Sequence, residues 1–280
     1  MTHTVLDYKS FSVPKLSEDE NDNFLAKQIS SALWQIIEKD IASENPLFLK
    51  VREGFIEELA LKIVKYPHKN LLLGVSGESA SGKSTLAKKI LEICIKDRKD
   101  LYTIITSDNY YKDYSKELKE YGSFEALLEH GINFDEPKAI DIDLLYRDLG
   151  RIKSGQTIYT PEYNFITIES IPHKIEMKPA KITLVEGLFV LEKEIRELLD
   201  ISIFISTPHD IIKERWYKRS ESRGKTGKAA DMLFEIVDRG AELYIRPYEK
   251  VADIVLSGVT SASYIAQIAE QIRNAIHSII

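Results

Sequence analysis

From residue 70 onward, short apolar segments alternate with stretches in which hydrophobic residues recur every three or four positions. The apolar segments are expected to be strands, at residues 71–76, 101–107, 182–185, 201–206 and 254–257. The periodic stretches are expected to be helices, at residues 84–96, 141–149, 210–222 and 262–279. Almost continuously apolar strands that alternate with helices are typical of a parallel sheet buried on both faces. The pattern therefore predicts an α/β fold in which helices flank a parallel sheet.

The first 69 residues follow a different pattern. Helical spacing predicts a first helix whose apolar residues are Phe24, Leu25, Ile29, Leu33, Ile36 and Ile37. A second helix is expected from Leu47 to Val64, with Pro67 marking its end. We therefore expect a helical N-terminal extension over residues 1–69 and a main domain over residues 70–280. The expected role of the extension is to pack against the main domain or to mediate assembly into a homo-oligomer.

The segment from Gly77 to Ser84 fits the pattern G-x-x-x-x-G-K-[ST] in full. It follows an expected strand and opens an expected helix, as a phosphate-binding loop (P-loop) does. Glycines let the backbone approach a phosphate closely, and the helix N-terminus carries a partial positive charge. Lys83 is expected to reach the β- and γ-phosphates, and the Ser84 hydroxyl to ligate Mg²⁺. The residues expected to bind ATP are Gly77, Glu78, Ser79, Ala80, Ser81, Gly82, Lys83, Ser84 and Thr85.

Two acidic residues follow expected strands directly, Asp108 after the second strand and Glu186 after the third. Ligands of open α/β sheets bind beyond the carboxyl ends of the strands, so both side chains should reach the same edge as the P-loop. A carboxylate there can hold Mg²⁺ or its waters, and another can receive the proton of an acceptor hydroxyl. Taken alone, either residue could also be a helix cap or a solvent-facing acid.

A basic helix is expected at residues 210–222. Arg215, Arg219 and Arg223 are four residues apart and so lie on one face of it. Residues 206–228 contain seven basic and three acidic side chains, a net charge of +4 in an acidic chain, and glycines follow the helix. These features predict a mobile lid over residues 206–228 whose arginines reach the phosphates on closure. The alternative interpretation is a solvated helix face.

Composition narrows the classes of function. The 280 residues include 38 basic and 44 acidic side chains, a net charge of −6, so general binding to nucleic acid is not expected. The single cysteine, Cys94, cannot form an internal disulfide and is expected in the core, which favours a reducing, cytoplasmic setting. Residues 1–12 have no signal-peptide pattern, and no apolar run is long enough to span a membrane.

The motifs together resemble the uridine kinase and phosphoribulokinase family over roughly residues 70–258. The P-loop alone would be unspecific, but the segments after it are not. These further segments are Ser107-Asp108-Asn109-Tyr110-Tyr111-Lys112, Asn133-Phe134-Asp135-Glu136-Pro137, Tyr163-Asn164-Phe165, Val185-Glu186-Gly187, the basic helix and Ala252-Asp253. The order and spacing resemble uridine kinases more than other members.

The resemblance implies a P-loop kinase fold and a role for each motif. Asp108 would be the catalytic base beside Lys83, with Ser84, Asp108 and Glu186 at the metal. Tyr111 and Asp135 would contact the acceptor sugar, and Tyr163 and Phe165 would flank its ring. The lid arginines would close over the phosphates.

Ile168 marks a departure from the resemblance, because uridine kinases carry a histidine at this position that reads the pyrimidine edge. His173 follows five residues later and could substitute. In the lid helix, Arg219-Ser220 replaces the Arg-Asp of the family. The N-terminal extension and Trp216-Tyr217 also resemble bacterial pantothenate kinase.

The expected function is an ATP-dependent kinase that phosphorylates a hydroxyl of a small metabolite, with uridine or cytidine as the leading acceptor. Pantothenate and sugar phosphates are the alternatives within this enzyme class. Another class stays open, a regulatory P-loop ATPase or nucleotide switch that binds a partner through residues 1–69. The chain has no Asn-Lys-x-Asp stretch, which counts against a GTPase. No nucleic-acid or membrane partner is expected.

Overall fold

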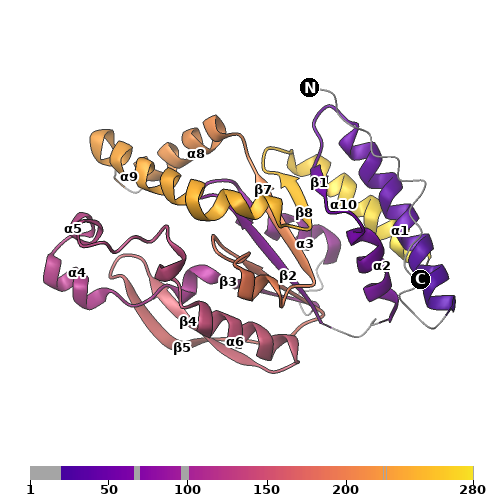
Figure 1. Ribbon diagram of the computed structural model, residues 1–280, viewed down its shortest axis with the longest axis horizontal. Helices are drawn as coiled ribbons and strands as arrows, with labels where there is room; N and C mark the ends of the chain where they lie inside the picture. Colours follow the sequence, from indigo (N-terminus) through magenta and orange to yellow (C-terminus); the bar gives the residue numbers. More distant parts are fainter. Residues whose placement is uncertain (1–19, 66–69, 96–100, 223, 225, 280) are drawn as a thin grey trace.

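The computed structural model describes residues 20–65, 70–95, 101–222, 224 and 226–279. Its centre is a six-stranded sheet with the order β1-β8-β7-β2-β6-β3 (Figure 1). The strands are β1 (Phe48–Val51), β2 (Leu71–Gly77), β3 (Tyr102–Thr106), β6 (Ile182–Glu186), β7 (Ile201–Ser206) and β8 (Ile254–Ser257). All neighbouring pairs are parallel except β1 and β8. The expected parallel sheet flanked by helices is thus confirmed, with one antiparallel edge strand.

Helices cover both faces of the sheet because its strands are apolar on both sides. One face packs against α1 (Glu20–Ile41), α2 (Phe55–Lys65), α3 (Lys83–Ile95) and α10 (Ala262–His277). The strand residues buried there are Phe48, Val75, Leu184, Ile205 and Leu256. The opposite face buries Leu72, Val185, Phe204 and Val255 in the same cluster as α6 (Ile142–Lys153) and the hairpin of β4 (Ile158–Asn164) and β5 (Glu169–Met177). Cys94 lies in α3, but its side chain is outside the described part of the chain.

The remaining elements lie in the connections between the strands. They include the short helices η3 (Ser107–Tyr110), α4 (Ser115–Tyr121), α5 (Phe124–Glu129), η4 (Pro137–Ala139), α7 (Lys193–Arg196), η5 (Ala241–Ile245) and η6 (Arg246–Lys250). Two longer helices, α8 (His209–Ser222) and α9 (Gly227–Gly240), lie at the upper left of Figure 1, and α4 and α5 lie below them. In the part of the chain described, no helix has both the length and the apolar character needed to cross a membrane.

The segment expected to be one helix from Leu47 to Val64 is a strand followed by a helix. Residues 48–51 form β1, which pairs antiparallel with β8 through Phe48 and Leu256. The carboxylate of Asp40 accepts from the amides of Leu47 and Phe48 at 3.2 and 2.7 Å, and this fixes the turn before the strand. The prediction was wrong here because the strand depends on a partner 200 residues away, which no local pattern reveals. Residues within the expected extension therefore complete the sheet of the main domain.

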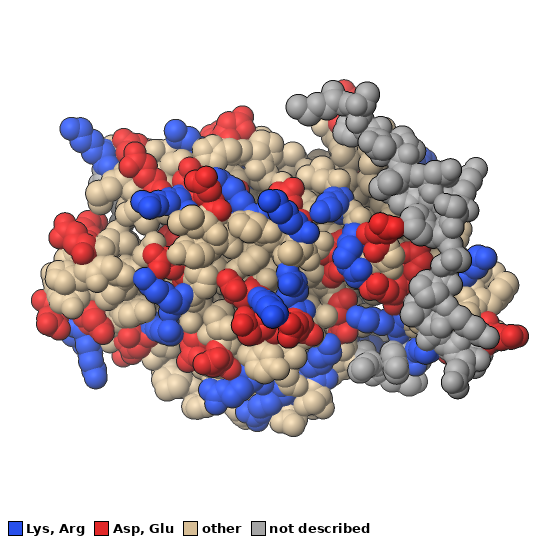
Figure 2. All heavy atoms as spheres, in the orientation of Figure 1, with Lys and Arg blue, Asp and Glu red and all other residues tan. Residues whose placement is uncertain are grey.

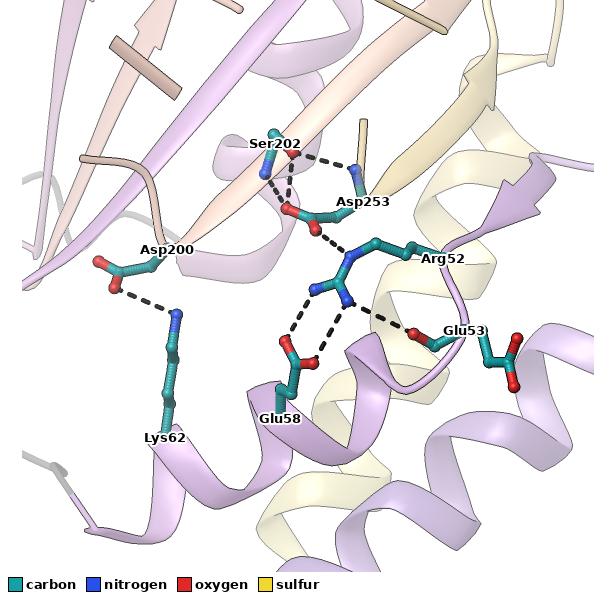
Figure 3. A network of polar contacts seen from close by, with 7 residues as sticks. All are labelled: Arg52, Glu53, Glu58, Lys62, Asp200, Ser202 and Asp253. Carbon is teal, nitrogen blue, oxygen red and sulfur yellow. Dashed lines mark hydrogen bonds and ion pairs between the residues drawn. The ribbon is translucent and has the colours of Figure 1, made fainter. Parts of the chain in front are cut away.

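A polar network joins the N-terminal segment to the start of β7 and β8 (Figure 3). Arg52 donates to Asp253 at 2.7 Å and forms a bidentate pair with Glu58 at 2.7 and 3.2 Å. The second oxygen of Asp253 accepts from the amide and hydroxyl of Ser202 at 2.9 and 2.6 Å. Nearby, Lys62 pairs with the Asp200 carboxylate at 3.5 Å. Charge-assisted bonds of this kind fix both distance and orientation.

Replacing Asp253 by alanine is expected to lower the free energy of unfolding by about 3 kcal/mol, because three donors lose their acceptor at a largely buried position. Urea unfolding curves would measure the change. Glu53→Ala is the matched control, since in Figure 3 the Glu53 side chain points away from the network. Equal losses in both variants would contradict a specific role of the network.

Candidate active site

The P-loop joins β2 to α3 in a conformation that its small residues allow. Gly82 and Ala80 have positive φ values of 94° and 65°. A Cβ at Gly77 would lie 2.8 Å from Ser81 Oγ and 2.9 Å from the Ile205 carbonyl oxygen. The turn therefore needs glycine at its first position, and the loop leads into the N-terminus of α3. Backbone amides and a helix N-terminus that converge in this way form an anion site.

Ser84, in the first turn of α3, and Glu186, the last residue of β6, lie beside each other. The Ser84 hydroxyl donates to a Glu186 carboxylate oxygen at 2.7 Å. The parallel register explains the contact, because β6 pairs with β2 so that Glu186 lies opposite Val75, just before the P-loop. Two hard oxygen donors at a phosphate site fit Mg²⁺, which binds through one or two protein oxygens plus phosphate oxygens. Among the described residues, no cluster of three or more His, Cys, Asp or Glu side chains offers a separate metal site.

Lys83 lies in the middle of a group of charges. Loss of water around its ammonium lowers the pKa of Lys83, while the nearby carboxylates of Asp108, Glu186 and Asp135 oppose that change and the guanidinium of Arg219 adds to it. Residues from β6, α8 and the loops after β3 thus place their charges around one lysine. This is the arrangement expected of a site that handles a highly charged ligand away from bulk water.

Asp108 follows β3 directly and lies in η3, where its amide donates to Thr106 Oγ1 at 3.3 Å. Its side chain lines the same cavity as Ser79 and Lys83 of the P-loop. The aspartate and the P-loop, expected to meet at the carboxyl edge of the sheet, are therefore neighbours. A carboxylate at this place can accept a proton from a hydroxyl brought up to a bound phosphate.

Two cavities meet at the P-loop. The first, which we call the P-loop cavity, has a volume of about 450 Å³ and extends from the P-loop to the start of α10; its walls include Gly82, Ser84, Thr85, Arg215, Gly258 and Ile265. The second, the aromatic cavity, has a volume of about 250 Å³ and contains Asp108, Tyr111, Phe134, Asp135, Phe165 and Trp216 in its walls. Lys83 and Arg219 line both cavities. Both cations can therefore contact a group at either cavity.

The aromatic cavity has a base of packed rings. The Tyr111 ring lies 5.7 Å from that of Phe134 and 6.0 Å from that of Phe165, and its hydroxyl donates to the Phe134 carbonyl at 3.2 Å. Burial, and then the charges of Asp108 and Asp135, raise the pKa of Tyr111 well above its usual range, so the hydroxyl stays protonated. Tyr163 is buried behind these rings, 5.3 Å from Tyr111 and 5.0 Å from Phe165, and is not a wall of the cavity.

Asp135 is a carboxylate held in surroundings that favour its neutral form. Burial, helped by the charge of Asp108 and opposed by that of Lys83, raises the pKa of Asp135 from 3.8 to about 6. The folded protein therefore holds this proton more tightly than the unfolded chain. Protonation of Asp135 contributes about 3 kcal/mol to the free energy of unfolding below pH 4. This contribution is lost as the pH rises through about 6.

The variant Asp135→Asn is consequently expected to be more stable than the unchanged protein at pH 8 and equally stable below pH 4. Asparagine imitates the neutral carboxyl and removes the cost of ionisation in the folded state. Thermal unfolding between pH 3.5 and 8, without nucleotide or metal, would measure the difference. The exposed Asp143→Asn variant is the control, and a parallel pH dependence in both variants would contradict this origin of the effect.

The arginines of α8 have different surroundings. Arg215 donates through one nitrogen to the carbonyls of Ser81 and Gly258 at 3.3 and 3.1 Å, so it is tied to the P-loop backbone. Thr207, just before the helix, donates to the same Ser81 carbonyl at 2.9 Å. Arg219 reaches both cavities, as described above. Arg223 lies outside the described residues.

Arg246 was not foreseen from the sequence. It donates to the Glu78 carboxylate of the P-loop at 3.0 and 3.2 Å and also pairs with Asp238 of α9. His209, at the start of α8, contacts the same Asp238 oxygen at 3.0 Å. This chain of contacts connects the P-loop with α8 and α9. No sequence signal indicated it, because Glu78 and Arg246 are 168 positions apart.

Leu233, Ile236 and Val237 of α9 also line the aromatic cavity and were not foreseen. Their three- and four-residue spacing within an amphipathic helix was the available signal. Ile168, by contrast, is buried in the main core and is not a wall of either cavity. His173 lies exposed in β5 and does not line the aromatic cavity, so it does not substitute there.

Comparison with known proteins agrees with the resemblance carried by the motifs. The sequence of residues 72–264 matches the family model of the phosphoribulokinase / uridine kinase family. A uridine kinase of Borrelia duttonii (strain Ly) is 33% identical over 191 residues, which cover 66% of this chain and 85% of that protein. A uridine kinase of Clostridium novyi (strain NT) is 35% identical over 189 residues, covering 66% of this chain and 86% of that protein.

Solved structures add little to this similarity. The phosphoribulokinase of Rhodobacter spheroides is 16% identical and covers 68% of this chain and 70% of its own, with a TM-score of 0.48. The family match spans most of the sheet, the P-loop, the loop that carries Asp108, and the helices α8 and α9. The family match supports an ATP-dependent phosphotransferase that acts on an alcohol. The chain belongs to the phosphoribulokinase / uridine kinase family.

Proposed function

We propose that this protein transfers the γ-phosphate of ATP to a hydroxyl of a small metabolite, with uridine or cytidine as the leading acceptor. The observation that carries the proposal is the meeting of two cavities at Lys83 and Arg219, with Asp108 on the acceptor side. A protein that only hydrolysed ATP would not need the second cavity. The identity between this chain and the two uridine kinases supports a nucleoside as acceptor.

The P-loop cavity would hold ATP. The backbone of residues Gly77 to Thr85 would surround the phosphates, and Lys83 would lie beside the β- and γ-phosphates. Ser84 and Glu186 would hold Mg²⁺, with Asp108 close to it as a further oxygen. When bound, Mg²⁺ supplies positive charge to the phosphate oxygens.

Asp108 would act as the catalytic base. Its carboxylate receives the proton of the acceptor hydroxyl as that oxygen forms a bond to the γ-phosphorus. The bond between the γ-phosphorus and the β–γ bridging oxygen breaks, and ADP leaves. Lys83 and Arg219 stabilise the charge that spreads over the phosphoryl oxygens during transfer.

The acceptor would lie on the aromatic cavity's ring base. Tyr111 and Asp135 are proposed to orient its sugar hydroxyls, and Phe165 to contact its ring. Tyr163 would contribute by supporting Tyr111 and Phe165 from behind, since it does not reach the cavity itself.

The helices α8 and α9 are proposed to act as a lid. Arg219 is the arginine best placed to reach a transferring phosphoryl group, because it lines both cavities. Arg215, tied to two carbonyls, would hold the lid against the P-loop. Arg223 is assigned to the lid on sequence grounds alone.

A role in nucleic-acid binding has less support. On the face seen in Figure 2, basic and acidic side chains are interspersed among the residues coloured by charge. The lid arginine that could contact a polyanion, Arg219, lines the cavities instead. We propose a cytoplasmic enzyme whose partner is a small acceptor molecule. The molecular mass of the protein in solution would show whether it assembles into a homo-oligomer.

The proposal is tested by ADP production from ATP and Mg²⁺ with a panel of acceptors: uridine, cytidine, pantothenate and ribulose 5-phosphate. ADP formation that depends on uridine or cytidine is expected. ADP formation at one rate with every acceptor and with none would overturn the proposal in favour of a regulatory ATPase. Binding of a protein partner, lost when residues 1–69 are deleted, would then identify that second class.

A further inference from the structure

The residues that line the aromatic cavity are of two kinds, charged and apolar. Next to the P-loop are the charged side chains of Lys83, Asp108, Asp135 and Arg219. The lining also includes Trp216 and Ser220 of α8, together with apolar walls from two separate parts of the chain. These walls are Phe124, Leu128 and Phe134 on one part and Leu233, Ile236 and Val237 of α9 on the other.

The charges in the cavity disfavour an acceptor that carries its own phosphate or carboxylate. Among the described residues that line it, the cations are Lys83 and Arg219, and both also line the P-loop cavity. The phosphates of bound ATP would therefore neutralise the positive charges of Lys83 and Arg219. The acidic side chains, Asp108 and Asp135, would repel a second anion placed beside the acceptor hydroxyl.

The apolar walls offer little to read a polar ring edge. The lining contains the amide side chain of Asn133. Both the nitrogen and the oxygen of this amide form hydrogen bonds within the same loop. The nitrogen donates to Glu136 at 3.1 Å, and the oxygen accepts from the Asp135 amide at 3.0 Å. Selection by hydrogen bonds needs polar groups aimed at the ligand, and apolar walls select by size and shape instead.

The α9 wall is held firmly in place. A Cβ at Gly240, the last residue of α9, would lie 2.6 Å from the Asp135 carbonyl oxygen, so the helix end packs directly on the loop that bears this carboxylate. Asp238 of the same helix pairs with Arg246, which also holds Glu78 of the P-loop. Phe234 packs on Trp216 of α8 at 5.3 Å between ring centroids. In this arrangement the apolar wall packs against both the loop that bears Asp135 and the network that reaches the P-loop.

We propose that the acceptor is uncharged and that α9 determines its choice, through apolar contact of Ile236 and Val237 with the part of the acceptor that does not react. This inference rests on the kinase function proposed above and adds the class of acceptor to it. The enzyme accepts nucleosides whose ring carries added apolar groups, discriminates poorly between ring edges of different polarity, and rejects phosphorylated sugars and carboxylates.

The test uses the full chain with saturating ATP and Mg²⁺. The acceptors are uridine, 5-methyluridine, cytidine, ribulose 5-phosphate and pantothenate. In the unchanged protein, kcat/KM for 5-methyluridine is expected to equal or exceed that for uridine, cytidine is expected within about tenfold of uridine, and the two anionic compounds are expected to be inactive.

The variant Ile236→Ala is expected to raise the KM for nucleosides roughly tenfold, with kcat and the KM for ATP little changed. Met232→Ala is the matched control, because Met232 is exposed on the same helix and does not line the cavity. If Ile236→Ala does not fold, Ile236→Val is expected to give a smaller increase of roughly threefold in the same constant.

The outcomes separate the two proposals. Preferential use of ribulose 5-phosphate or pantothenate would overturn an uncharged acceptor while leaving a kinase. Nucleoside KM values that stay the same in the Ile236 variants would overturn the role of α9. ADP formation independent of every acceptor would overturn the kinase function, and this inference with it.

Discussion

Replacing Lys83 by alanine is expected to abolish ATP turnover, with a loss of about a thousandfold or more in kcat/KM. The side chain lines both cavities, lies near three carboxylates and belongs to the P-loop itself. Removing one preorganised donor from a charged transition state typically costs 10²- to 10³-fold, and Lys83 is also proposed to hold the phosphates of bound ATP. Steady-state ADP formation measures the loss.

Lys88→Ala provides the control for this variant, because Lys88 is an exposed lysine of the same helix that lines neither cavity. Thermal unfolding of both variants would show that the folded state is retained. Turnover in Lys83→Ala at the level of Lys88→Ala would remove the P-loop from the mechanism.

The second large effect is expected from Asp108→Asn. Asparagine has nearly the same shape as aspartate but cannot accept a proton at neutral pH, and loss of a general base typically costs about 10²- to 10⁴-fold in rate. The loss is expected in kcat, with the KM for ATP little changed, because Asp108 is proposed to act on the acceptor hydroxyl. Initial rates at varied uridine and varied ATP separate the two constants.

The variant Asp108→Asn also distinguishes a base from a phosphate contact. A base is needed for transfer to the acceptor, so the ratio of transfer to slow hydrolysis of ATP by water should fall. An unchanged kcat, or a loss confined to the KM for ATP, would contradict the assignment of Asp108 as the base.

The central strands could be predicted because their signal is local. Residues 201–206 and 254–257 coincide with β7 and β8, since a strand buried on both faces is apolar at nearly every position. The strand β1 could not be predicted, because four residues acquire strand structure only through pairing with β8. Its apolar residues continue into those of α2 and so imitate one long helix.

The candidate site could be predicted where its parts are ordered along the chain. Asp108 and Glu186 each follow a strand, and parallel strands end at the same edge, so their approach to the P-loop follows from topology. The contacts of Arg246 and the apolar wall formed by α9 could not be predicted, because they depend on how the chain folds back after α8. The sequence of α9 shows an apolar stripe but not what the stripe faces.

The pairing of β1 with β8 has a consequence for any shortened form of the protein. The family match starts at residue 72, which suggests a natural place to trim. A chain trimmed there would leave β8 as the outermost strand, with a row of free amides and carbonyls open to other molecules. It would also expose the apolar surfaces of α10 that α1 normally shields. Such a fragment would keep every residue proposed for phosphoryl transfer and would still tend to aggregate through its sheet.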